Sequence, residues 1–169
     1  MPTNGNREAM TSTVWIARTA VLLALTVAIQ MLGLPQPVTG PAVNAMLILT
    51  ALLVTPAAGV VVGIFTPVIA LWRGILPAPL APMVPFIALG NALLVLVFVL
   101  IYRRQASLAV VTAAIVKFVV LSTAVRVFVT VPEPVALAMQ TPQLVTAIVG
   151  GFVALIIYRI LRNHSSFAE

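Results

Sequence analysis

The sequence predicts an all-helical membrane protein with six transmembrane helices, and three observations lead to that class. Hydrophobic residues make up 62% of the 169 positions, charged residues make up only 7%, and the mean hydropathy is +1.21. Soluble domains carry about 25% charged residues, so a water-soluble core is excluded. We expect an N-terminal tail at 1–13, a six-helix domain at 14–162 and a C-terminal tail at 163–169.

The first helix is expected at residues 14–31. The run lacks a small-x-small cleavage site, so it is interpreted as a helix rather than as a signal peptide. Ala20, Ala24 and Ala28 recur at intervals of four residues and lie on one face. Small residues at this spacing permit another helix to approach closely. An alanine-rich face turned toward lipid is the alternative.

Prolines and glycines delimit the next two helices. An uncharged loop carrying Gln36 and Thr39 is expected at residues 33–41, followed by a short helix at 41–55 with Asn44 in its first turn. Thr55-Pro56 is the next break, and a helix is expected at 57–72. This helix contains two glycines four residues apart, which indicate close packing inside the chain or dimerisation.

Residues 72–85 contain four prolines, and they predict either a re-entrant loop over a cavity or an interfacial connector. Trp72 and Arg73 open this stretch. The fourth helix is expected at 86–102 and carries Asn91, whose amide needs a polar partner if it is buried. Asn91 is therefore expected either to brace another helix or to contact a ligand.

The fifth helix is expected at residues 106–131, with Lys117 near its middle. Lys117 lies ~16 Å along the axis from Ala106, about half the depth of the hydrocarbon layer. A charge there costs about 2.5–3.5 kcal/mol, so the default interpretation is a functional role. Arg126 lies nine residues further on, on the opposite side of an ideal helix at ~180°. It is expected either to bind a ligand or to extend its side chain to the membrane interface.

A turn carrying Glu133 is expected at 131–139, with Gln140 at its end, and the last helix at 141–161. Thr141 and Pro142 suit the start of this helix, and Gln143 follows in its first turn. An ion pair between Lys117 and Glu133 is disfavoured, because helix rise separates them by ~20 Å.

The distribution of arginines predicts that both termini lie in the cytoplasm. With six spans, the two termini share one side, and most arginines flank the helix ends on that side. Only Arg73 clearly lies opposite. The arginines on the terminal side are Arg7, Arg18, Arg103, Arg104, Arg159 and Arg162.

The polar residues exclude most catalytic chemistry. The acidic residues are Glu8, Glu133 and Glu169, there is no Asp or Cys, and His164 is the single histidine. Carboxylate pairs, Ser-His-Asp triads and metal clusters cannot be built from this set, so no catalytic residue, metal or cofactor is expected. The basic residues lie at helix ends, which suits a lipid bilayer and argues against nucleic acid.

The remaining polar side chains converge on the outer half of the predicted bundle, where cations outnumber carboxylates. This balance predicts a small ligand with a carboxylate, a phosphate or an electron-rich heterocycle, bound from outside. The candidate binding residues are Gln36, Thr39, Asn44, Trp72, Arg73, Asn91, Lys117, Arg126, Gln140 and Gln143.

The alanine face of the first helix, residues 40–91 and the Lys117 helix together resemble the substrate-binding S components of energy-coupling factor (ECF) transporters. The resemblance covers nearly all of residues 14–162. It implies capture of a vitamin, micronutrient or coenzyme precursor at a prokaryotic plasma membrane. It also implies a coupling membrane subunit docked on Ala20, Ala24 and Ala28, and two ATPase subunits, because this chain has no phosphate-binding loop.

The sequence departs from that family in lacking a motif specific to one substrate. Tyr102 and Tyr158 fall at the cytoplasmic helix ends, so the outer half is poor in aromatic residues, which disfavours large flat ligands. Two other functions remain open at this point. One is a membrane scaffold or assembly subunit without transport activity, and the other is a stand-alone secondary carrier.

Overall fold

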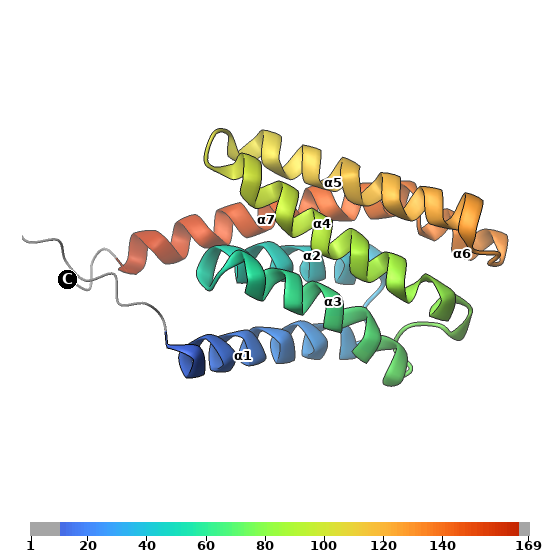
Figure 1. Ribbon diagram of the computed structural model, residues 1–169, viewed down its shortest axis with the longest axis horizontal. Helices are drawn as coiled ribbons and strands as arrows, with labels where there is room; N and C mark the ends of the chain where they lie inside the picture. Colours follow the sequence, from blue (N-terminus) through green and yellow to red (C-terminus); the bar gives the residue numbers. More distant parts are fainter. Residues whose placement is uncertain (1–10, 166–169) are drawn as a thin grey trace, which may run out of the picture.

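The computed structural model describes residues 11–165, and every regular element within that range is helical (Figure 1). The α-helices are α1 (Ser12–Met31), α2 (Gln36–Leu53), α3 (Pro56–Trp72), α4 (Val84–Tyr102), α5 (Ala106–Thr123), α6 (Glu133–Ala138) and α7 (Thr141–Ser165). A 3₁₀ segment η1 (Ala78–Met83) precedes α4, and a π-helical segment η2 (Ala124–Phe128) extends α5.

The long helices lie side by side along one axis and alternate in direction (Figure 1). α2 packs most extensively against α7, and α4 packs against both α3 and α5, whereas α1 contacts α2 and α3 at the edge of the bundle. α1 begins and α7 ends at the same end of the bundle (Figure 1). The short helix α6 lies at the opposite end.

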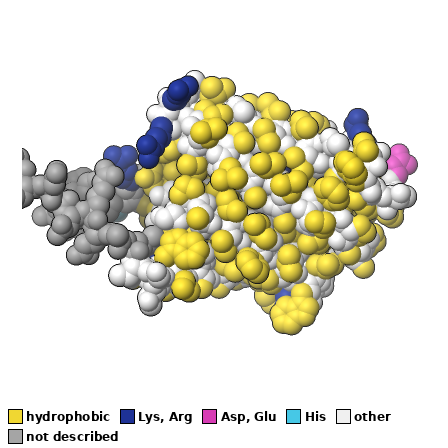
Figure 2. Space-filling view, viewed as in Figure 1, with side chains coloured by type: hydrophobic (Ala, Val, Ile, Leu, Met, Phe, Trp, Pro, Cys, Tyr) yellow, Lys and Arg dark blue, Asp and Glu magenta, His cyan; other side chains and the backbone are white. Residues whose placement is uncertain are grey.

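The helices are compatible with a membrane-embedded protein. Five helical segments within the described residues are long and apolar enough to cross a bilayer, and α3 is a shorter apolar helix. About 20 apolar residues suffice for the ~30 Å hydrocarbon core. Large apolar side chains point outward, including Leu100, which is 80% exposed. On the face shown in Figure 2, hydrophobic side chains cover the middle and most of the basic ones lie near the two ends.

Thr55 fixes the break between α2 and α3, as the sequence predicts. Its Oγ1 accepts a hydrogen bond from the Ala58 backbone N–H at 3.1 Å, and Pro56 occupies the first helical position. The same oxygen accepts a hydrogen bond from Trp15 Nε1 at 2.8 Å. One threonine therefore starts α3 and ties α1 to the bundle.

The expected loop at residues 33–41 is wrong, because α2 begins at Gln36. Pro35 precedes the helix, and its carbonyl oxygen accepts hydrogen bonds from the backbone N–H groups of Val38 and Thr39. Pro37 lies in the first turn, where a missing N–H costs nothing. Pro41 has no backbone N–H, so one helical hydrogen bond is missing there, and the helix nevertheless continues through it. The site residues Gln36, Thr39 and Asn44 thus belong to one helix.

The expected end of the fifth helix at residue 131 is also wrong. Regular α5 ends at Thr123, η2 adds one wide turn, and Val129 is extended. The helix has therefore ended before Val131, the residue that Pro132 restricts to extended geometry. The expected turn at 131–139 contains α6, which begins just after Pro132. The irregular stretch at 72–85 contains η1.

Candidate functional site

A cavity of about 520 Å³ opens among the helices. It is lined by the end of α1, the start of α2, the end of α3, η1, and parts of α4, α5, α6 and α7. These parts all belong to the end of the bundle opposite the described chain ends (Figure 1). Its polar lining residues are Gln30, Gln36, Thr39, Asn44, Thr66, Asn91, Lys117 and Gln143. Small-molecule sites span about 300–1,000 Å³, so the volume suits a small organic ligand.

Lys117 is the charged side chain at the centre of this site. It lies midway along the 23-residue span Ala106–Phe128 and is only 4% exposed. Its Nζ donates hydrogen bonds to Asn44 Oδ1 and Asn91 Oδ1, both at 2.7 Å. Hydrogen bonds from a charged donor are roughly twice as strong as neutral ones. The ammonium is therefore held by two neutral amides rather than by a carboxylate.

The two asparagines are themselves held by backbone carbonyls. Asn91 Nδ2 donates to the Gly63 carbonyl oxygen of α3 at 3.0 Å, and Asn44 Nδ2 donates to the Gly40 carbonyl oxygen of its own helix at 2.9 Å. Asn91 thus braces a neighbouring helix, one of the two roles expected for it. Because each Nδ2 has a carbonyl partner, each Oδ1 is directed at Lys117.

Glycines on α3, α4 and α7 let neighbouring helices approach closely enough to bring these side chains together. A Cβ on Gly63 would lie 3.0 Å from Asn91 Cβ, and one on Gly90 would lie 3.3 Å from Lys117 Cγ. A Cβ on Gly150 would press on the Pro41 carbonyl oxygen and on Asn44. Gly63, one of the two glycines expected to favour close packing or dimerisation, is therefore used within the chain. Close backbone approach is what places both amides within reach of one ammonium.

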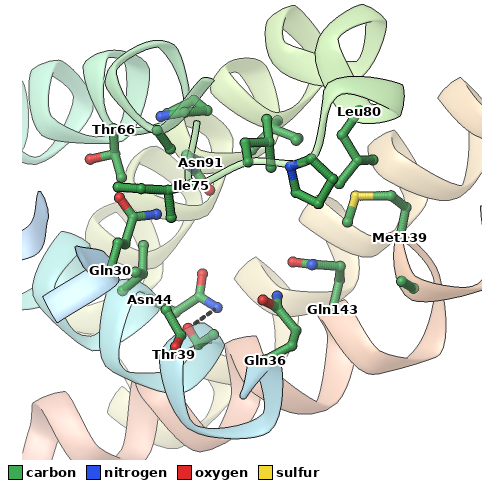
Figure 3. Close-up of a pocket in the computed structure, with 18 of the residues that line it drawn as sticks. Gln30, Gln36, Thr39, Asn44, Thr66, Ile75, Leu80, Asn91, Met139 and Gln143 are labelled. Atoms are coloured by element: carbon green, nitrogen blue, oxygen red, sulfur yellow. Dashed lines mark hydrogen bonds between the residues drawn. The ribbon is translucent and has the colours of Figure 1, made fainter. Parts of the chain in front are cut away.

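Six of the ten candidate binding residues line the cavity: Gln36, Thr39, Asn44, Asn91, Lys117 and Gln143. Gln143 is 8% exposed, and its side-chain amide has no hydrogen bond to any described residue. Figure 3 shows Gln36, Asn44 and Gln143 directed toward the open space between the helices. The amides of Gln36 and Gln143 can hydrogen-bond a ligand without first breaking a bond within the described part of the protein.

The other four candidates lie outside the lining. Arg126 is exposed and donates from Nε and Nη2 to Gln140 Oε1, at 3.2 and 2.7 Å. It lines a separate groove of about 230 Å³ on the outer side of α5. Trp72 is 81% exposed, and Arg73 is exposed beside it at the end of α3. None of these four residues contributes a wall or a charge to the cavity.

Two cavity residues were not singled out from the sequence. Gln30 lies in the last turn of α1, and its Oε1 is buried without a hydrogen-bond partner among the described residues. Thr66 lies in α3, and its Oγ1 donates to the Val62 carbonyl oxygen at 2.5 Å. An amide in an otherwise apolar helix was the available signal for Gln30. Thr66 carried no such signal, since threonine in a membrane helix commonly satisfies itself on its own backbone.

The sequence disfavours an ion pair between Lys117 and Glu133, and Glu133 is exposed on α6, outside the cavity lining. Within residues 11–165, no group of three or more His, Asp or Glu side chains could hold a metal ion. Ala20, Ala24 and Ala28 are exposed on the outer face of α1, where the rest of the described chain does not cover them.

The fold and the site together define a class: a bundle of apolar helices around a largely apolar cavity, with the buried Lys117 and several amide side chains in its lining. Comparison with known proteins adds no particular relative, since no family model, curated protein or solved structure matches the chain.

Proposed function

We propose that this protein is the substrate-capture subunit of an ATP-driven importer of the ECF type. The observation that carries the proposal is Lys117, buried at mid-helix and facing a cavity of about 520 Å³ without a carboxylate beside it. Burying an unpaired charge costs several kcal/mol, and a membrane protein retains such a group where it serves a ligand or a transport path.

In this proposal six helices span the membrane, with α3 as the shortest, and both termini lie in the cytoplasm. The cavity then opens outward, at the end of the bundle opposite the described chain ends. Arg103 and Arg104, between α4 and α5, lie on the cytoplasmic side, in keeping with the preference of arginine for that side. The solute enters from outside and binds beside Lys117.

The energy for uptake comes from partner chains in this proposal, a coupling membrane subunit and two ATPases, and the chain itself is not an enzyme. The exposed alanines of α1 support this part. Only 11% of the apolar segment of α1 is buried against the rest of the protein, and its small side chains leave room for a neighbouring helix. From the resemblance, we expect the carried solute to be a micronutrient or coenzyme precursor.

Capture is tested by purifying the wild-type protein and Lys117→Met in detergent and analysing extracted metabolites by mass spectrometry. Lys117 is the only lysine in the chain, so this change removes the single amine side chain. We expect a compound that co-purifies with the wild-type protein and is lost from Lys117→Met, while circular dichroism shows that both remain helical. Equal recovery of the compound from both proteins would show that Lys117 does not bind it.

The importer is distinguished from the two other functions by its partners and its energy source. Co-purification with two ATPases and a membrane subunit supports the importer, whereas co-purification with cytoskeletal or wall-synthesis proteins supports the scaffold. Uptake into liposomes that contain this chain alone would instead establish a secondary carrier.

The orientation is tested with single cysteines, because the natural chain has none. Gln36→Cys at the cavity end and Arg104→Cys at the other end form a matched pair, since both positions are exposed. In intact cells, we expect a membrane-impermeant maleimide to label Gln36→Cys and not Arg104→Cys. Labelling of Arg104→Cys and not of Gln36→Cys would show that the topology is inverted.

A further inference from the structure

When Lys117 is protonated, the cavity carries a net charge of +1 among the described residues. Lys117 is its only ionisable lining residue. Glu133, Arg73 and Arg126 are exposed and outside the lining. A buried charge is stable only when it is paired and hydrogen-bonded, so the charge of the bound ligand should balance that of Lys117.

The hydrogen bonds around Lys117 leave donors rather than acceptors available. An ammonium has three N–H donors and each asparagine amide has two. Lys117 uses two of its three on Asn44 Oδ1 and Asn91 Oδ1, and each asparagine uses one of its two on a backbone carbonyl. One N–H therefore remains on each of the three side chains, while both amide oxygens already accept from Nζ. This arrangement is complementary to an oxyanion.

Gln30 approaches the cavity from α1 and contributes an amide to its lining. Its Oε1 is buried and accepts no hydrogen bond from any described residue, and in Figure 3 the amide nitrogen is the end that faces the open space. Gln30 therefore adds an N–H donor to the cavity and no acceptor.

The walls between these polar ends are aliphatic. Ile75, Leu76, Leu80, Ile87 and Met139 line them, and the described lining contains no Phe, Tyr or Trp. The cavity volume of about 520 Å³ corresponds to roughly 17 water molecules of ~30 Å³ each. Such walls suit a compact aliphatic body and offer no ring on which a flat aromatic ligand could stack.

We infer that the captured solute is a small, singly charged carboxylic acid with an aliphatic body. Its carboxylate binds Lys117, Asn44 and Asn91. The inference rests on the proposed capture function and narrows its ligand. A phosphate monoester, with a charge of about −1.5 to −2 at pH 7, would leave excess negative charge in the cavity. A neutral ligand would leave the ammonium unbalanced.

Three matched probes test the charge by thermal shift and titration calorimetry at millimolar concentration. N-acetyl-leucine has one negative charge. N-acetyl-leucinamide lacks the charge, and N-acetyl-glutamate has two charges. We expect N-acetyl-leucine to bind best and the neutral amide to bind roughly 30-fold or more weakly, as when one partner of a buried charge pair is lost.

A variant then assigns the charged end of the ligand to Lys117. In Lys117→Met the preference for the acid over the amide should disappear. Gln105→Leu, an exposed position at the other end of the bundle, is the matched control and should bind like the wild type.

The outcomes separate this inference from the capture function. If the amide or the diacid binds as well as N-acetyl-leucine, the ligand class is wrong and capture stands. If no probe binds, native mass spectrometry of wild-type protein decides: a co-purified monocarboxylic acid supports the class, and a phosphate, a cation or a neutral compound overturns it. A protein that carries no compound and binds none overturns capture itself.

Discussion

Asn44 and Asn91 lie on different helices and share one hydrogen-bond donor, with each Oδ1 2.7 Å from Lys117 Nζ. The ammonium therefore joins α2, α4 and α5 at a single point. Since both partners are neutral, the positive charge is stabilised and yet remains uncompensated. A change to either asparagine should alter the charge of the cavity as much as its shape.

Asn44→Asp should abolish the binding of an anionic ligand. The carboxylate would pair with Lys117 and supply internally the charge that the ligand otherwise brings. The Asn44 Nδ2 bond to the Gly40 carbonyl is lost, but it lies within one helix, so the fold should persist. We expect at least roughly 30-fold weaker binding of N-acetyl-leucine by calorimetry.

Asn44→Ser, which is smaller but neutral, is the control for Asn44→Asp and should keep a preference for the acid over its amide. Unchanged acid binding in Asn44→Asp would show that the ligand does not meet the charge of Lys117.

Gly150→Ala should destabilise the bundle. The added Cβ would contact the Pro41 carbonyl oxygen and lie 2.8 Å from Asn44 Cβ, so α2 and α7 would have to separate. Overpacking of this kind costs about 1–3 kcal/mol, and the shift of Asn44 should weaken ligand binding as well. Thermal unfolding in detergent measures the first effect.

Val149→Ala, one residue earlier on the exposed face of α7, is the control for Gly150→Ala. It should change stability by about 0.5 kcal/mol or less, as exposed positions do. Equal stability of Gly150→Ala and wild type would mean that the helices are less closely packed there.

Arg126→Gln should leave ligand binding unchanged within about two-fold, a difference of ~0.4 kcal/mol. Arg126 donates to Gln140 on the exposed side of η2 and does not line the cavity. Titration of N-acetyl-leucine against the variant and the wild type measures the effect. A loss comparable to that of Lys117→Met would place Arg126 in the site and would require η2 to rearrange on binding.

Ala24→Trp should prevent assembly with a coupling subunit and leave ligand binding intact. Ala24 is exposed on α1, so a large side chain is accommodated in the isolated protein but blocks a neighbouring helix. Co-purification of the ATPases measures assembly, and calorimetry measures binding. Leu100→Trp, on the outer face of α4, is the control and should assemble normally. Normal assembly of Ala24→Trp would place the interface elsewhere.

The part of the site that could be predicted from the sequence consists of single residues whose burial in a membrane helix costs much free energy. Lys117 in an apolar run and Asn91 in the preceding helix are recognisable from the sequence, because a buried charge or amide needs partners. Arg126 and Arg73 raised the same expectation, yet the structure turns both outward. Long side chains near a helix end can reach water, so their sequence position does not determine where their charge goes.

Local sequence determined the helical class, the apolar surface and the breaks at residues such as Thr55 and Pro132, because hydropathy and proline geometry act over a few neighbouring residues. Tertiary structure alone decided that Asn44 and Asn91 meet at Lys117, beside the same cavity. Those contacts join residues 26 to 73 positions apart, and they depend on glycines that let whole helices approach. Pairing over such distances is fixed by the packing of the bundle, which no local pattern encodes.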